Sequence, residues 1–263
     1  MRGPMQPPPP RWLGALAGAV ILLLHLPLLV LVVFSFNASR FSVEWTGFTL
    51  DWYRRLLERP DILRGLRISL LVGVSATAIA TISGTLLALA LGRHRFRGRR
   101  TLESLIYVPL VTPEIVVGIS LLTLFAAVGM SLGVGTIIIA HVAFSISFVT
   151  VIVRARLAGM DTNLEEAAMT LGADEVTTFF RVTLPQLMPG ILAGALLAFT
   201  LSFDDYVITS FVAGSGSSTL PVVVYGMVRR TIEPSVNAIS TVVLAVTSVL
   251  IYFADRLSRS RTA

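Results

Sequence analysis

The stretch that decides the fold class is residues 12–36, WLGALAGAVILLLHLPLLVLVVFSF, which contains no Asp, Glu or Arg. About 20 apolar residues allow a helix to cross the hydrocarbon core of a bilayer, so this run is long enough to span one. Arg2 and Arg11 in front of it are also typical of a signal peptide. However, the run exceeds the roughly 7–15 residues of a cleavable core, and no A-x-A-like site follows it. We therefore predict a retained first span.

The rest of the chain has a matching composition. Of its 263 residues, 54% are hydrophobic and only 14% are charged, and the mean hydropathy is +0.81, whereas an average soluble domain is about 25% charged. The net charge of +6 comes from 21 basic residues, all arginine, placed between apolar runs. That placement indicates membrane topology and not nucleic-acid binding. The absence of cysteine excludes disulfides, thiolate zinc sites and a cysteine nucleophile.

Four further apolar stretches follow the first. The longest runs from residue 104 to 153, and the three glycines within residues 129–135 divide it by a tight turn. We predict an all-α polytopic membrane protein with about six transmembrane helices in a single transmembrane domain, 12–254, between tails 1–11 and 255–263. The predicted spans are about 12–36, 68–91, 104–128, 136–153, 187–211 and 236–254.

The arginines also predict the orientation, because cytoplasmic loops carry an excess of basic residues. With the N-terminus inside, 13 arginines lie in the cytoplasm and eight outside. The densest cluster, residues 93–100, is then cytoplasmic, although six of the eight external arginines share the first external loop. We predict that both termini are cytoplasmic.

The one polar connection too long for a simple turn is residues 155–186. Its first half places apolar residues at spacings of three and four, which predicts one helical stripe: Leu157, Met160, Leu164, Ala168 and Leu171. Thr162 and Glu165 fit a capping box, and Gly172 is placed to end the helix.

Asp174 is placed to cap a second short helix, which we predict to run to Val182 and to end before Pro185. The connection is thus predicted to be a helix–turn–helix outside the membrane with an apolar face that needs a partner. The alternative is an amphipathic hairpin that only covers its own bundle.

This connection resembles the EAA loop of ABC-importer permeases. The match consists of Glu166-Ala167-Ala168, three residues, Gly172, nine residues, and Val182-Thr183-Leu184-Pro185. The resemblance implies that the loop is cytoplasmic and docks on a separate ATPase subunit, which holds ATP and Mg²⁺. The site residues that it implies for ATPase coupling are Glu166, Ala167, Ala168, Gly172, Leu184 and Pro185.

Acids inside predicted spans form a second set of candidates. Glu114 lies about ten residues into the third predicted span, and Asp204 and Asp205 lie near the outer end of the fifth. A charge at the bilayer centre costs about 2.5–3.5 kcal/mol on insertion scales, so these acids are expected to face a wet cavity or a partner. Several carboxylates along one path favour a polycation as cargo. Trp45, with Trp52 and Tyr53, would add cation–π contacts to an amine.

Each of these candidates has a structural alternative. Glu114 would instead pair with an arginine or hydrate a helix broken by proline. Asp204 and Asp205 would form an interfacial helix end, and Trp45 and Trp52 would be interfacial anchors. His25 and His141 have no partner at metal-ligand spacing, which favours core or lipid-interface roles and no metal site.

Several segments also resemble the second permease subunit of spermidine/putrescine importers, over about residues 20–250. They are Phe36-Asn37-Ala38-Ser39-Arg40-Phe41, residues 45–49, residues 95–98, Thr112-Pro113-Glu114-Ile115-Val116 and Leu201-Ser202-Phe203-Asp204-Asp205. The resemblance implies a substrate pathway through Trp45, Glu114, Ser202, Asp204 and Asp205. Glu114 stands where that family carries aspartate. The implied partners are ATPase subunits, a second homologous permease subunit and an external binding protein, all at the bacterial inner membrane.

No catalytic grouping of residues is recognisable, and Gly214-x-Gly216 lacks the lysine and preceding strand of a phosphate loop. We therefore expect a permease that is not an enzyme, binds no cofactor itself and carries a polyamine. Three alternatives remain open: an ABC permease for another small solute, a proton-coupled secondary transporter with Glu114 or Asp204 as the coupling acid, and an assembly protein without transport activity.

Overall fold

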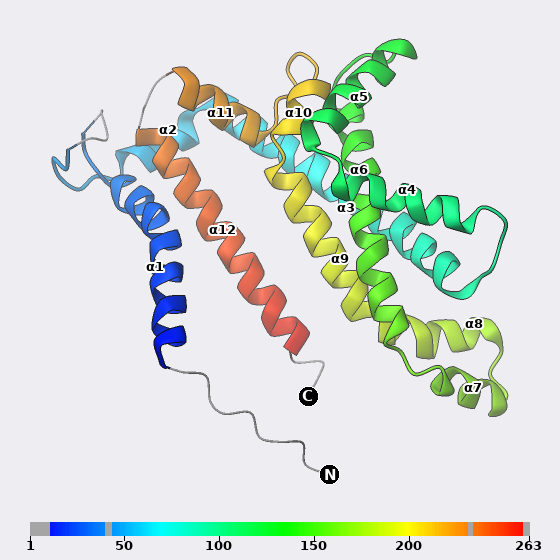
Figure 1. Cartoon of the computed structure of the whole chain (residues 1–263). Coiled ribbons are helices and arrows are strands. Elements are labelled where there is room, and N and C mark those ends of the chain that lie inside the picture. Colours follow the sequence, from blue (N-terminus) through cyan, green and yellow to red (C-terminus); the bar gives the residue numbers. More distant parts are fainter. Residues whose placement is uncertain (1–10, 40–43, 231–233, 260–263) are drawn as a thin grey trace. The chain divides into compact units, whose positions relative to one another are not determined.

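The computed structural model describes residues 11–39, 44–230 and 234–259, and the described backbone is helical apart from connections and one isolated bridge between Asn37 and Phe48 (Figure 1). The chain divides into two compact units, residues 1–59 with 226–253 and residues 60–225 with 254–263. The helices are α1 Arg11–Phe34, α2 Asp51–Glu58, α3 Pro60–Arg93, α4 Arg99–Val111, α5 Glu114–Ala127, α6 Val134–Ala158, α7 Asn163–Thr170, α8 Glu175–Thr178, the π-helical turn η1 Phe179–Thr183, α9 Leu184–Asp204, α10 Val207–Val212, α11 Leu220–Arg230 and α12 Pro234–Arg259.

The predicted all-α membrane fold is confirmed. Among the described residues, four helices are long and apolar enough to cross a membrane, and a bent pair makes a fifth candidate. The first, second and fourth predicted spans correspond to α1, α3 and α6, and the last falls on α12, whose segment Pro234–Val249 is apolar. The predicted tail 1–11 lies almost entirely outside the described residues.

The third predicted span is not one helix. α4 and α5 meet at a bend of 114°, whereas we predicted a single helix over 104–128. Proline lacks an N–H and disfavours the helical region for the residue before it. Thr112, which precedes Pro113, is accordingly extended, with φ −78° and ψ 132°. Glu114 therefore begins a helix and does not lie ten residues inside one.

The fifth predicted span, 187–211, is also corrected at both ends. At its C-terminal end, α9 stops at Asp204, Asp205 has an extended backbone with ψ 123°, and α10 starts afresh at Val207. Aspartate favours such breaks because its side chain competes for nearby backbone N–H groups. At its start, Pro185 does not follow the end of a helix, because α8, η1 and α9 form one continuous helical segment, Glu175–Asp204.

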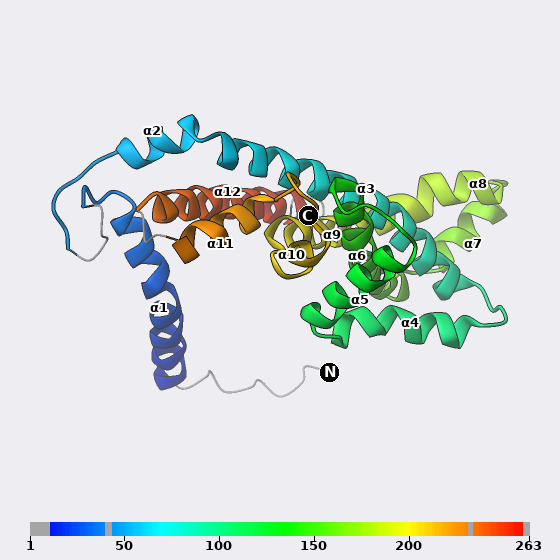
Figure 2. The same cartoon turned by 90° about the horizontal axis from the view of Figure 1, so that it is seen from above.

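The centre of the second unit is the packing of α3, α6 and α9 on one another, which Figures 1 and 2 both show. Membrane helices approach closely where small residues lie between them. A Cβ atom added to Gly84 of α3 would lie 2.8 Å from Cβ of Val149 on α6. The hydroxyl of Thr150 also donates across this contact to the carbonyl oxygen of Gly84, at 3.3 Å.

Two buried apolar clusters flank this contact. One joins α3, α5, α6 and α10 through Val72, Phe125, Ile137, Phe144 and Ile208. The other joins α3, α6 and α9 through Ala88, Val149, Val153, Leu187 and Ala198. The three long helices thus form the frame that positions the shorter α5, α7, α8 and α10.

We expect Gly84→Ala to destabilise the protein by about 1–3 kcal/mol, because the added methyl group overpacks the contact with Val149. Thermal unfolding of the purified complex in detergent measures the effect as a lower Tm. The matched control is Gly135→Ala on α6, where the added Cβ has no heavy atom within 4 Å. An unchanged Tm for Gly84→Ala would show that α3 and α6 are not packed this tightly.

A second prediction concerns Asp174, the N-cap of α8, whose carboxylate accepts the N–H of Thr177 at 2.9 Å. Hydrogen bonds from Thr177 hold the pKa of Asp174 below its ordinary value. The cap is therefore present above about pH 4, the ordinary aspartate range, and is lost as the pH falls through the lowered pKa. We expect hydrogen exchange at the Thr177 amide, corrected for its intrinsic rate, to accelerate over that acid range.

Asp174→Asn keeps an N-cap that does not titrate. Its Thr177 amide is expected to stay protected at every pH, while Asp174→Ala loses the protection throughout. Parallel pH profiles for the aspartate and asparagine forms would contradict the assignment of this cap.

Candidate functional site

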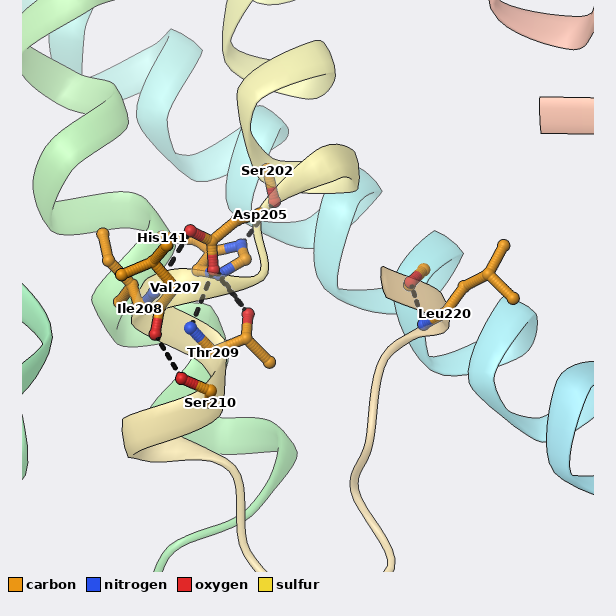
Figure 3. Close-up of polar contacts among 9 residues, drawn as sticks. His141, Ser202, Asp205, Val207, Ile208, Thr209, Ser210 and Leu220 are labelled. Carbon is orange, nitrogen blue, oxygen red and sulfur yellow. Dashed lines mark hydrogen bonds and ion pairs between the residues drawn. The ribbon is translucent and has the colours of Figure 1, made fainter. Parts of the chain in front are cut away.

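Four polar side chains from three helices meet in the interior of the second unit (Figure 3). His141 comes from α6, Ser202 from α9 and Thr209 from α10, while Asp205 lies at the break between α9 and α10. All four are buried, with exposed fractions of 0% for His141 and Thr209, 3% for Ser202 and 9% for Asp205. We refer to these four residues as the buried polar cluster.

Hydrogen bonds connect every member of the buried polar cluster. His141 Nδ1 lies 2.7 Å from Ser202 Oγ, and His141 Nε2 lies 3.0 Å from Thr209 Oγ1 and 3.3 Å from Asp205 Oδ2. The backbone N–H and the hydroxyl of Thr209 both donate to Asp205 Oδ2 at 2.7 Å. The N–H of Ile208 donates to Asp205 Oδ1 at 3.3 Å. The Asp205 carboxylate therefore both caps α10 and holds it to α6.

The predicted pathway residues do not all meet in this cluster. Ser202 and Asp205 are buried in it, whereas Asp204 is exposed beside it. Glu114 is exposed at the start of α5. This helix packs closely on α10, where a Cβ on Gly118 would lie 2.6 Å from the ring of Phe211. Trp45 belongs to the other unit and is 51% exposed.

Neither Thr209 nor the partners of His141 were predicted from the sequence, although one of the two roles favoured for His141, a core position, agrees with its burial. Its partners are 61 and 68 residues away in the chain, so no local spacing marks it. Its position in an apolar span was the only available signal, because a histidine in hydrocarbon requires a polar partner.

The aromatic residues of the segment between α1 and α3 divide in a similar way. Trp52 is buried, donates its indole N–H to the carbonyl oxygen of Asn37 at 2.8 Å, and has Arg55 5.2 Å above its ring. The hydroxyl of Tyr53 contacts Ser35 Oγ at 2.6 Å. Trp52 and Tyr53 thus hold the loop together, while Trp45, edge-on to Phe34, keeps an exposed ring.

The predicted coupling loop forms the two expected helices, α7 and α8, and Gly172 ends the first of them with φ +95°. The capping box predicted between Thr162 and Glu165 is wrong, because α7 has no side-chain cap. The Glu165 carboxylate instead binds Arg93 at the end of α3 and the hydroxyl of Thr183 in η1. These two bonds join α7 to two other elements.

The predicted apolar stripe is also divided between two surfaces. Leu157 and Met160 precede α7 and pack against the core cluster of α3, α6 and α9. The apolar residues that remain outside lie on α7, its C-terminal end, α8 and η1, and each is at least 44% exposed: Leu164, Met169, Leu171, Val176 and Phe180. We call these five residues the exposed loop face.

The structure places the predicted coupling residues beside this face. Glu166 and Ala167 are exposed on α7, and Ala168 is half-buried. Leu184 is half-buried, and Pro185 is exposed in the first turn of α9. Pro185 thus lies in the continuous helical segment that joins α8 to α9.

Three comparisons with known proteins agree with this architecture. The sequence matches the family "Binding-protein-dependent transport system inner membrane component" over residues 84–262. It is 39% identical over 249 residues to the spermidine/putrescine transport system permease protein PotC of Escherichia coli K12, covering 95% of this chain and 94% of PotC. It is 41% identical over 238 residues to the putrescine transport system permease protein PotI of the same organism, covering 88% and 85%.

Solved structures with the same fold include that of a bacterial ABC transporter involved in the import of the acidic polysaccharide alginate, with a TM-score of 0.75, 16% identity and 96% coverage of both chains. A methionine ABC transporter, MetNI, matches with a TM-score of 0.61 and 18% identity over 81% of this chain and 99% of its own. These likenesses establish the fold. The family match over residues 84–262 and the identity to PotC show that this chain belongs to the inner-membrane components of binding-protein-dependent transport systems.

Proposed function

We propose that this chain is the transmembrane permease subunit of an ABC importer for a polyamine such as spermidine or putrescine. The observation that carries the proposal is the 39% and 41% identity to polyamine permeases along nearly the whole chain. Exposed carboxylates at Asp204 and Glu114 suit a polycationic cargo.

The energy of ATP hydrolysis would reach this chain through the exposed loop face. Five apolar side chains on a solvent-facing hairpin favour a partner surface, and an ATPase subunit that holds ATP and Mg²⁺ is the partner that we assign to it. A displacement of the exposed loop face would reach α9 through the continuous helix of α8 and η1. It would reach α3 through the bond between Glu165 and Arg93. This chain would bind no cofactor and hydrolyse no ATP itself.

The cargo would then pass Trp45, Asp204 and Glu114. The aromatic ring of Trp45 is exposed for a cation–π contact with an amine, and each carboxylate would attract an ammonium group. Ser202 and Asp205 are buried. They would keep Asp204 in position and would not bind cargo directly. A second, similar permease subunit and an external binding protein would complete the importer, with both termini of this chain in the cytoplasm.

The test is uptake by the whole complex reconstituted in proteoliposomes, with ATP inside and the binding protein and radiolabelled spermidine or putrescine outside. We expect uptake that requires ATP. Uptake driven by a proton gradient without the ATPase would support the secondary transporter instead, and no uptake of any amine would contradict the cargo assignment.

The first variant prediction concerns coupling. Glu166→Lys reverses an exposed charge beside the exposed loop face, and we expect at least an order-of-magnitude loss of uptake per ATP hydrolysed. Membrane insertion should not change, because Glu166 is exposed. The control is Arg54→Gln, a partner in an exposed ion pair on α2. Normal coupling in Glu166→Lys would remove the loop from the ATPase interface.

The second variant prediction concerns cargo. Asp204→Asn and Glu114→Gln each remove one exposed negative charge, and we expect the KM for polyamine uptake to rise about tenfold in each. Binding of the ATPase subunits should stay normal in both. Glu58→Gln is the matched control, since Glu58 is an exposed acid paired with Arg54. Unchanged KM values would exclude these carboxylates from the pathway.

A further inference from the structure

We infer that His141 is a positioning residue for cargo transport: it fixes the break between α9 and α10 so that Asp205 is held inward and Asp204 is left exposed. The break puts two neighbouring carboxylates on opposite sides, one buried and one exposed. A contact with another helix is needed to determine which of the two carboxylates turns inward. His141, on the long helix α6, forms hydrogen bonds on both sides of the break.

The hydrogen-bond directions assign a role to each ring nitrogen. The hydroxyl hydrogen of Thr209 is given to Asp205 Oδ2, so towards His141 the same hydroxyl oxygen is an acceptor. His141 Nε2 must therefore carry a hydrogen, which points at Thr209 Oγ1 and lies near Asp205 Oδ2 (Figure 3). The Nδ1 atom is left to contact Ser202, on α9 one turn before the break.

His141 thus holds the break from both sides, and we call its two contacts the Nδ1 arm and the Nε2 arm. The Nδ1 arm holds the last turn of α9, and the Nε2 arm holds the first turn of α10 with the carboxylate that caps it. A buried carboxylate that loses a donor incurs a desolvation cost. Without the Nε2 donor, Asp205 is expected to turn outward and compete with Asp204 for the cargo.

The side-chain lengths of asparagine and glutamine separate the two arms. The amide of asparagine reaches about as far as Nδ1 of histidine, and that of glutamine about as far as Nε2. We expect His141→Gln to keep most of the uptake, because it still reaches Thr209. His141→Asn and His141→Ala are expected to lower Vmax/KM for polyamine about tenfold. His25→Asn is the control, since His25 is exposed on α1 and contacts only the carbonyl oxygen of Ile21 among the described contacts.

A second measurement reports on the break directly. The chain contains no cysteine, so Ser202→Cys alone provides a unique thiol in this subunit at the buried contact with His141. In the reconstituted complex, prepared with partner subunits that lack cysteine, a membrane-impermeant maleimide should label this thiol slowly with His141 present. Labelling should accelerate at least tenfold with His141→Ala or His141→Asn, and not with His141→Gln. Ser210→Cys, at an exposed position on α10, provides the fully labelled reference.

The inference rests on the proposed polyamine pathway only for the uptake measurement. If no amine is transported, the proposed cargo fails, and labelling of the Ser202→Cys thiol still decides whether His141 fixes the break. A thiol that stays protected in His141→Ala would overturn the positioning role, even if uptake fell. Uptake by His141→Asn equal to or above that of His141→Gln would overturn the assignment of the Nε2 arm.

Discussion

Within a bilayer every backbone N–H and C=O must find its partner inside the protein, because no water is available to replace it. This constraint explains why the described chain is helical and why its exceptions are few. Where a helix does break, a side chain has to satisfy the released groups. At the end of α9 that side chain is Asp205, which accepts the N–H groups of Ile208 and Thr209. The break therefore places a buried carboxylate in the interior, and His141 Nε2 lies 3.3 Å from it.

The two broken spans have different chemical origins. Pro113 separates α4 from α5 because it offers no N–H and keeps Thr112 extended. Asp205 separates α9 from α10 by binding backbone N–H groups that would otherwise continue a helix. In both places an acid of the proposed pathway lies at the break, Glu114 directly after the first and Asp204 directly before the second. A carboxylate at a helix end is less confined than one in the middle of a span, which suits contact with a passing cation.

Sequence alone predicted the fold class, most spans and the position of the coupling loop, because hydropathy and glycine placement are local signals. It also predicted the helix end at Gly172 and the cap at Asp174. It failed where contacts join distant residues. Thr162 and Glu165 have the spacing of a capping box, but Arg93 and Thr183 are stronger partners for Glu165, and neither is close to it in the chain. The partners of His141 were not predicted, for the same reason. The assignments of Asp204, Glu114 and Trp45 to a pathway stay predictions.

The bonds of Glu165 have a mechanical consequence. Its single carboxylate ties α7 to the end of α3 and to the π-helical turn that leads into α9. α7 therefore cannot tilt independently, since any rotation must either stretch both bonds or move α3 and η1 with it. A force applied to the loop would therefore act on both α3 and α9. These two helices would then move together and not independently.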